Sequence, residues 1–317
     1  MTETTRTGFG SGMGALGAKL TALAPARRIA DPRPGPAVPD PLPPDEFELI
    51  SVDVGDIWMS RRDEVMRPYM QRARTWEPEE GRLLRSFVTP GCRFLDIGAN
   101  VGYFSVLVGS AAPGVTVDSV EPDPGNVRAL RFNLWSNRIN GTVWPLALDS
   151  RDRFLALSGN EHNFGDLRSG RIEANTYSAD SPLLAPQNDQ QKPAVSGGSG
   201  GSGGWVVPAA SGDELFAGRG FDLVKIDVQG WEFDVILGLD KVLLRSPGVR
   251  IVTEFWPAPL RAIDRSPTDI LARYRQLGYR VRVAMGDDIV ELTDNETVAV
   301  CDSGGPDGQV NLLLERG

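Results

Sequence analysis

Three short motifs contain most of the residues that could do chemistry. The first is LDIGANVGYFS, residues 95–105, in which an apolar run delivers Asp96 and is followed at once by Gly98 and Gly102. Glycines in such a turn let the backbone approach a ligand where a side chain would block it. A second apolar run, TVDSV, ends in Glu121, 25 residues after Asp96. Because a carboxylate there can accept hydrogen bonds from both hydroxyls of an adenosine ribose, the pair of motifs predicts an adenosine-containing ligand.

The glycine spacing discriminates between adenosine cofactors. A dinucleotide fingerprint needs G-x-G-x-x-G, so that a helix N-terminus can meet a pyrophosphate. Counted from Gly98, the second and third glycine positions hold Asn100 and Tyr103, which disfavours a Rossmann oxidoreductase. S-adenosylmethionine has no phosphate, and its sulfonium and ammonium suit the negative charge of Asp96. We therefore predict S-adenosylmethionine, against the plain alternative of a turn that binds nothing.

Two further motifs supply candidates for a general base. KIDVQGWE, residues 225–232, puts Asp227 at the carboxyl end of a central strand, where ligands sit in open α/β sheets. TEFWP, residues 253–257, puts Glu254 near the end of the next strand. His162 is the only histidine, and an unperturbed imidazole titrates near pH ~6.5, which suits proton transfer. Since it lies in an irregular segment, a solvent-exposed bystander is the simpler interpretation. Lys225, inside the apolar run, is expected to be buried and paired.

A divalent ion is the alternative to a protein base. Asp227 and Glu254 lie on adjacent expected strand ends, and a metal there would lower the pKa of an acceptor hydroxyl. Two oxygen atoms fall well short of a coordination shell, so no metal site is predicted.

Strands alternate with helices from Arg93 onward, which predicts a parallel sheet with helices on both faces. Helices are expected at 102–112, 124–140, 231–239 and 269–277. Strands are expected at 93–97, 116–120, 142–148, 221–228, 250–256, 279–284 and 310–315.

The segments before and within this alternating region differ from it in composition and expected structure. Residues 1–44 form an N-terminal extension with a proline-rich linker, and residues 45–317 the methyl-transferring domain inferred below. Residues 47–59 alternate around a glycine and predict a hairpin, and Thr75 is expected to cap a helix with Pro78 in its first turn. Residues 158–205 interrupt the alternation of strands and helices. The repeat SGGSGGSGG at 196–204 is typical of an engineered linker, and a natural flexible loop is the alternative.

The amino-acid composition limits the classes of partner that the protein is expected to bind. The net charge is −9, from 33 basic and 42 acidic residues, which disfavours a nucleic-acid substrate. A nucleic-acid amino-methylase would also need two prolines after the acid of the central strand, whereas Asp227 precedes Val-Gln-Gly. No apolar run reaches the ~18 residues of a membrane span, so no membrane association is predicted. Two distant cysteines, Cys92 and Cys301, suggest a reducing cytoplasm. The sequence carries no signal for an oligomeric state.

Taken together, FLDIGANVGYFSVL, VEPDPGN, LVKIDVQGWE and TEFWP resemble the FkbM family of S-adenosylmethionine-dependent methyltransferases, from about residue 58 onward except for the glycine–serine stretch. The resemblance implies a class I, Rossmann-like seven-stranded α/β sheet with its last strand antiparallel. It implies methyl transfer to a hydroxyl of a small natural product or sugar. Gln229 departs from the family, whose members often carry glutamate there. The cofactor-binding positions that the resemblance implies are Glu77, Asp96, Gly98, Asn100, Gly102, Glu121, Pro122 and Asn126.

Methyl transfer to a hydroxyl needs an acceptor held in line and a base that takes its proton, the latter typically contributing about 10²–10⁴-fold. Asp227 is the best-placed base. Two other functions stay open: N-methylation of a small molecule, and a cofactor-binding protein without catalysis.

The first prediction concerns cofactor choice. Calorimetry should show that S-adenosylhomocysteine binds and that NADH does not, because the turn lacks two of the three dinucleotide glycines. Micromolar binding of NADH without binding of S-adenosylhomocysteine would refute the assignment.

Overall fold

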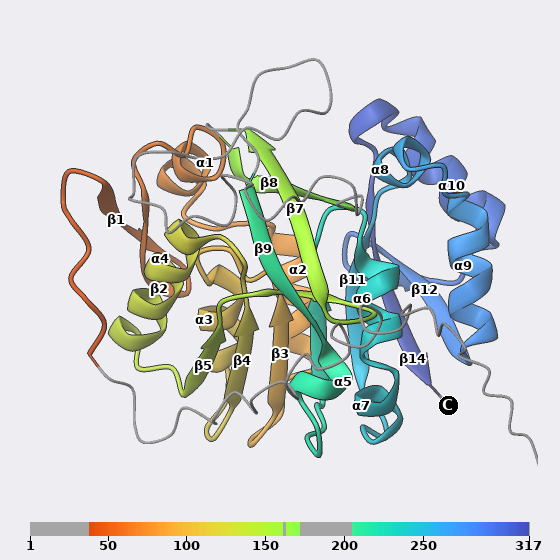
Figure 1. Cartoon of the computed structure of the whole chain (residues 1–317), viewed down its shortest axis with the longest axis horizontal. Coiled ribbons are helices and arrows are strands. Elements are labelled where there is room, and N and C mark those ends of the chain that lie inside the picture. The colour runs from red at the N-terminus through yellow and green to blue at the C-terminus, as the bar shows by residue number, and fades with distance from the viewer. Residues whose placement is uncertain (1–37, 161–162, 172–204, 317) are drawn as a thin grey trace, which may run out of the picture. The chain divides into compact units, whose positions relative to one another are not determined.

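A mixed sheet of eight of the described strands carries the fold (Figure 1). The computed structural model describes residues 38–160, 163–171 and 205–316. The strands run across the sheet in the order β13-β12-β14-β11-β10-β3-β4-β5. Their bounds are β3 Arg93–Ile97, β4 Thr116–Val120, β5 Gly141–Trp144, β10 Leu223–Ile226, β11 Arg250–Phe255, β12 Tyr279–Met285, β13 Asp288–Val290 and β14 Val310–Arg316.

The strand directions confirm the predicted class of fold. Strands β5, β4, β3, β10 and β11 are parallel to their neighbours, whereas β14 lies antiparallel between β11 and β12. This is the seven-stranded arrangement with an antiparallel last strand. The three-residue β13, which the sequence did not suggest, adds an eighth strand through a hairpin with β12.

Both faces of the sheet are buried, which explains the near-continuous apolar runs of its strands. On β3, Leu95 belongs to a core cluster with residues of α6, α7 and α9, whereas its neighbour Phe94 belongs to a second cluster with residues of α2, α3 and α4. Successive side chains of a strand point to opposite faces, so the two clusters define the two sides. The prediction of helices on both faces is therefore confirmed.

The helices of the described ranges are short. Their bounds are α1 Met66–Ala73, α2 Pro78–Ser86, α3 Tyr103–Gly109, α4 Pro124–Ser136, α5 Gly212–Leu215, α6 Glu232–Gly238, α7 Asp240–Leu244, α8 Pro257–Ala262, α9 Pro267–Gln276, α10 Asp294–Ser303 and the 3-10 helix η3 Gly305–Asp307. Asp123 caps α4, its side chain accepting from the backbone N–H of Asn126. The N-cap of α2 is Glu77 rather than Thr75.

A second sheet corrects the prediction for residues 142–148. That run splits into β5 and β6 (Ala147–Asp149), and β6 belongs to a four-stranded sheet of order β6-β9-β7-β8. The remaining strands are β7 Arg153–Asn160, β8 Asn163–Arg171 and β9 Trp205–Ser211. The irregular composition of 158–205 therefore concealed strands at both of its ends. The glycine–serine stretch 196–204 lies outside the described residues.

The predicted hairpin over 47–59 is present as β1 (Phe47–Val52) and β2 (Gly55–Ser60). Asn133 of α4 ties it to the main sheet. The Asn133 side chain accepts from the backbone N–H of Trp58 at 2.7 Å and donates to the carbonyl oxygens of Trp58 at 2.8 Å and Val101 at 2.7 Å. Since Asn133 has no exposed surface, one amide satisfies three buried backbone groups.

Among the described residues, no helix is long and apolar enough to cross a membrane. Cys92 and Cys301 are both buried free thiols.

Replacement of Asn133 by alanine should lower the free energy of unfolding by about 2–4 kcal/mol, because several buried backbone groups lose their partners. Chemical denaturation measures the change. Asn140→Ala, at an exposed position on the loop before β5, is the matched control and should shift stability by less than about 0.5 kcal/mol. Equal effects of the two variants would contradict this role of Asn133.

Candidate active site

A cavity of about 340 Å³ opens where the parallel strands end. Its wall contains Gly98 after β3, Glu121 after β4, Asp227 after β10 and Glu254 of β11. In open parallel sheets this edge is where ligands bind, because the connecting loops diverge there. The predicted residues that line the cavity are Glu77, Gly98, Asn100, Glu121, Pro122, Asp227 and Glu254.

The turn after β3 needs glycine at position 98. Gly98 has a φ of +79°, and a Cβ there would lie 1.9 Å from the backbone oxygen of Asp227. Any other residue would push β3 away from β10. Gly102 has a packing role instead, because a Cβ there would lie 2.5 Å from the side chain of Leu130, and Gly102 does not line the cavity.

Glu121 is fixed at the end of β4 by backbone donors. Its carboxyl oxygens accept from the N–H groups of Asn100 at 2.9 Å and Asp123 at 2.8 Å. The side chain of Asn126 also hydrogen-bonds to it, so Asn126 acts through Glu121 and does not line the cavity itself. Burial raises the pKa of Glu121 to about 8. The carboxyl group lines the cavity, where hydroxyl groups of a ligand can reach it, and it is only partly ionised at neutral pH.

Asp96 occupies a place different from the predicted one. It is fully buried below the turn, where Oδ2 accepts from Ser105 Oγ at 2.5 Å, and Ser105 in turn contacts Ser119 Oγ at 2.8 Å. Asp96 does not line the cavity, so the geometry does not support direct contact with a cofactor. Burial raises its pKa, an effect that the nearby Lys225 partly offsets. Its role here is to join β3, α3 and β4.

Lys225 is the buried, paired lysine that the sequence predicted. Only 1% of the residue is exposed, and its Nζ lies 2.9 Å from Asp227 Oδ2 and 4.7 Å from the centre of the Phe104 ring. The surrounding carboxyl groups, Asp227 first and then Glu80, Asp96 and Glu77, outweigh burial and raise the pKa of Lys225.

Gln229 joins the two candidate bases. Its Nε2 donates to Asp227 Oδ1 at 3.0 Å and to Glu254 Oε2 at 3.2 Å. Gln229 has a φ of +55°, so the turn after β10 is held in a left-handed conformation that side chains rarely adopt. Glu232 stabilises this turn, accepting from the N–H groups of Val228 at 3.1 Å and Gly230 at 3.0 Å. The amide is thus the donor that lets two carboxyl groups lie side by side.

Glu254 and Glu77 are the other acidic side chains near Asp227. Burial first, and then the charge of Asp227, raises the pKa of each. Glu77 is also hydrogen-bonded to Glu80, whose own pKa burial raises further. This hydrogen bond lowers the pKa of Glu77 and raises that of Glu80.

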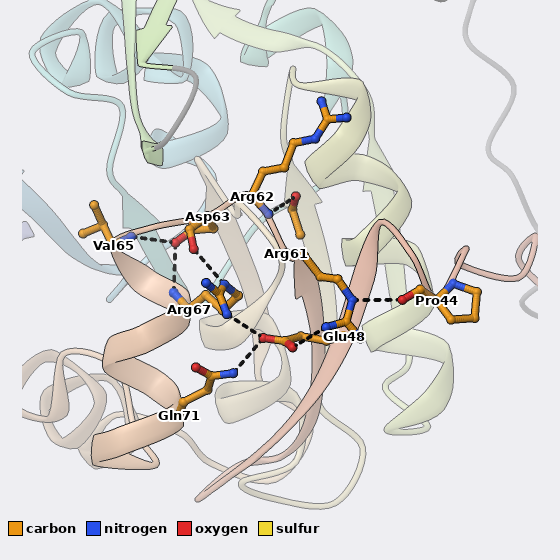
Figure 2. Close-up of polar contacts among 9 residues, drawn as sticks. Pro44, Glu48, Arg61, Arg62, Asp63, Val65, Arg67 and Gln71 are labelled. Carbon is orange, nitrogen blue, oxygen red and sulfur yellow. Dashed lines mark hydrogen bonds and ion pairs between the residues drawn. The ribbon is translucent and has the colours of Figure 1, made fainter.

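The N-terminal wall of the cavity is held by the contacts drawn in Figure 2. Arg61, Arg67 and Gln71 converge on the carboxylate of Glu48, at 2.7–3.0 Å. Asp63 Oδ1 accepts from the backbone of Val65 at 3.1 Å and Arg67 at 2.9 Å and so caps α1. Val65 and Met66, which follow, line the cavity, and the side chain of Arg62 points away from this cluster (Figure 2).

Several lining residues escaped the sequence analysis. Trp231 is buried, and its Nε1 donates to Asp149 Oδ2 at 3.0 Å, while Arg153 and Arg265 lie within 6 Å of its ring. A tryptophan two residues after Gln229 was visible in the motif, but its partner on β6 was not. The remaining lining residues that were not predicted include Trp76, Tyr103, Leu157, Trp256, Asp307 and Gln309.

The predicted His162 lies outside the described residues. Among the residues that the structure describes, no group of three or more His, Cys, Asp or Glu side chains could hold a metal ion. Asp227, Gln229 and Glu254 are polar residues that line the cavity at the ends of β10 and β11.

Comparison with protein families identifies the domain. The family model described as the methyltransferase FkbM domain matches residues 96–281, which is more than half of the chain. The chain belongs to the FkbM methyltransferase family. Membership implies S-adenosylmethionine as the cofactor. The site fits that cofactor, since the Gly98 turn after β3 and the Glu121 carboxyl group after β4 both line the cavity.

One curated relative of this FkbM-family protein is the 31-O-demethyl-FK506 methyltransferase FkbM of Streptomyces tacrolimicus. It is 43% identical over 54 residues, 17% of this chain, and the matched segment spans about a fifth (21%) of the relative's length.

Solved structures resemble the fold at low identity. A precorrin-6y C5,15-methyltransferase of Geobacter metallireducens GS-15 has a TM-score of 0.39 at 15% identity, over 77% of this chain and 93% of that one. A TehB-like SAM-dependent methyltransferase of Corynebacterium glutamicum ATCC 13032 Kitasato has a TM-score of 0.41 at 11% identity, over 79% and 94%. At these TM-scores the similarities carry no functional argument.

Glu121 should make cofactor affinity depend on pH. Its carboxylate form accepts from hydroxyl donors better than its protonated form, and its pKa in the ligand-free protein is about 8. Affinity for S-adenosylhomocysteine should therefore rise between about pH 6 and pH 8, as the fraction of ionised Glu121 grows. The folding stability of the ligand-free protein depends on pH in the opposite direction. The contribution of the raised Glu121 pKa to stability is fully present below the unfolded pKa near 4.5, and it is lost as the pH rises through about 8.

Calorimetry of Glu121→Gln tests this. The variant preserves the side-chain shape and should bind S-adenosylhomocysteine more weakly by roughly 1.5–3 kcal/mol, with a flatter pH profile. Glu291→Gln, at an exposed carboxylate far along the chain, is the control. A Glu121→Gln protein with the parent's affinity at every pH would show that Glu121 is not a ligand.

Proposed function

We propose that this protein transfers a methyl group from S-adenosylmethionine to a hydroxyl oxygen of a small natural product or sugar, with Asp227 as the general base. The observation that carries the proposal is the placement of Asp227. Its carboxylate lines the cavity at the end of the central strand, and Lys225 and Gln229 each hold one of its oxygens. When bound, S-adenosylmethionine would supply an electrophilic methyl group.

The choice of Asp227 over Glu254 rests on protonation. Burial and the charge of Asp227 raise the pKa of Glu254 well above its ordinary value, which favours the protonated form of Glu254. A protonated carboxyl group cannot accept the proton of an acceptor hydroxyl. Asp227 instead pairs with the ammonium of Lys225, and a carboxylate in such an ion pair has lone pairs left over for that hydroxyl. Glu254 and Gln229 would then orient the acceptor.

Two features favour oxygen as the methyl acceptor. A hydroxyl needs a base, since it is a poor nucleophile while protonated, and the cavity provides one. The relative from Streptomyces tacrolimicus is named as an O-demethyl-FK506 methyltransferase. N-methylation and cofactor binding without catalysis remain the competing functions, and the assay below separates them.

The assay follows labelled methyl groups from S-adenosylmethionine into a panel of hydroxylated natural products, glycosides and amines. Asp227→Asn should lower the transfer rate to the hydroxyl acceptor by about 10²–10⁴-fold and leave affinity for S-adenosylhomocysteine close to that of the parent. Asp287→Asn, at a highly exposed carboxylate, is the matched control.

Full activity of Asp227→Asn would remove Asp227 as the base. Transfer to amines alone would favour the N-methyltransferase. Loss of activity on chelation of divalent ions would point to a metal in place of the base.

A further inference from the structure

The acidic side chains of the cavity fall into two groups along the sheet. Glu121 follows β4, whereas Asp227 and Glu254 belong to β10 and β11, on the other side of β3. Neighbouring strands lie about 4.8 Å apart, so Asp227 is roughly 10 Å from the strand end that carries Glu121. A ligand whose ribose meets Glu121 and whose chain passes the Gly98 turn therefore extends towards Asp227 and Glu254.

The acidic residues that line the cavity outnumber the basic ones. Among the described residues that line the cavity, Lys225 is the one basic residue, and its ammonium is already paired with Asp227. The acidic lining residues are Glu77, Glu121, Asp227, Glu254 and Asp307.

Glu254 is a largely buried carboxyl group in the cavity wall. The residue is 8% exposed, and Oε2 accepts from Gln229 at 3.2 Å. A carboxylate at such a depth is costly unless a neighbouring group or a ligand supplies positive charge or hydrogen bonds.

We propose that Asp227 and Glu254, held together by Gln229, form a subsite for the sulfonium of S-adenosylmethionine, so that this protein binds the charged cofactor in preference to its neutral thioether product. The inference rests on the proposed function, because it places that cofactor in the cavity. S-adenosylmethionine and S-adenosylhomocysteine differ by one methyl group and one positive charge. Two carboxyl groups in a partly buried site can distinguish that charge, since the effective dielectric constant is far below that of water.

The protonation of Glu254 is consistent with such a subsite. Burial and the charges of Asp227, Glu232 and Glu77 raise its pKa, and Lys225 lowers it. A bound sulfonium would favour the ionised form of Glu254. The product, which has lost the charge, no longer compensates the carboxylate, and this favours its release.

Three ligands test the proposal by calorimetry at about pH 8: S-adenosylmethionine, S-adenosylhomocysteine, and sinefungin, which carries an ammonium in place of the S–CH₃ group. The parent should bind the two cationic ligands about tenfold or more tightly than S-adenosylhomocysteine. Glu254→Gln should reduce that preference to about threefold or less and leave affinity for S-adenosylhomocysteine unchanged. Unchanged affinity for the neutral ligand distinguishes lost charge recognition from damage to the fold.

Two controls accompany the test. Asp227→Asn, which also preserves shape, should reduce the preference in the same way and keeps the test decisive if Glu254→Gln does not fold. Glu291→Gln should keep the parent's preference.

Equal or tighter binding of S-adenosylhomocysteine by the parent, or a full preference in both cavity variants, would overturn the sulfonium subsite and leave the proposed function standing. Binding of none of the three ligands by the folded parent would overturn both.

Discussion

The ion pair between Lys225 and Asp227 is the interaction on which the active end of the sheet depends. An ammonium buried to 1% exposure costs several kcal/mol unless carboxylates compensate it. Asp227 supplies the direct contact, and Asp96, Glu77 and Glu80 supply the surrounding charge. Burial raises the pKa values of Glu77, Glu80 and Asp96, and the negative charge of Asp227 raises them further. The acidic character of the cavity follows from the way the central strand is buried.

The end of β10 also lies directly against the cofactor turn. Gly98 abuts the backbone of Asp227, so the turn after β3 packs against the end of β10 without an intervening side chain. Glu121 links β4 to the same turn by holding the N–H of Asn100. The opposite wall is built differently: α1 and the β1–β2 hairpin are attached through side chains, by Asn133 and by the Glu48 cluster. The cavity thus has one wall of adjoining strand ends and one wall attached by polar side chains.

The sequence predicted those parts of the fold that depend on local pattern. Apolar runs gave the strands β3, β4, β10, β11, β12 and β14 to within a few residues, because each is buried and bounded by a turn signal. Residues 142–148 misled, since one apolar run serves two sheets and only tertiary pairing divides it at Leu146. Strands β7, β8 and β9 were missed because they border a stretch of turn-forming residues.

The residues of the candidate site also divide into those that the sequence could identify and those that only the structure places. Gly98, Glu121 and Asp227 were identifiable, since a strand end followed by a turn places them at one edge of the sheet. Asp96 was misplaced because the motif does not say to which side its side chain turns, and Ser105 and Ser119 decide that. Gln229 was noted in the sequence only as a departure from the family. The structure shows its contacts, because its side-chain amide donates to two carboxyl groups that come from different strands.

The position of β14 bears on the order in which the chain can assemble. Strands β12 and β13 reach the main sheet only through β14, which lies between β12 and β11 although it follows both in the sequence. While the chain is being synthesised, β11 therefore has an unpaired edge, and the β12–β13 hairpin has no sheet to join. Exposed strand edges of this kind are sites of mispairing between chains. The parallel half of the sheet, with the cofactor turn, is complete earlier in the chain, so this half can form before β12, β13 and β14 join it.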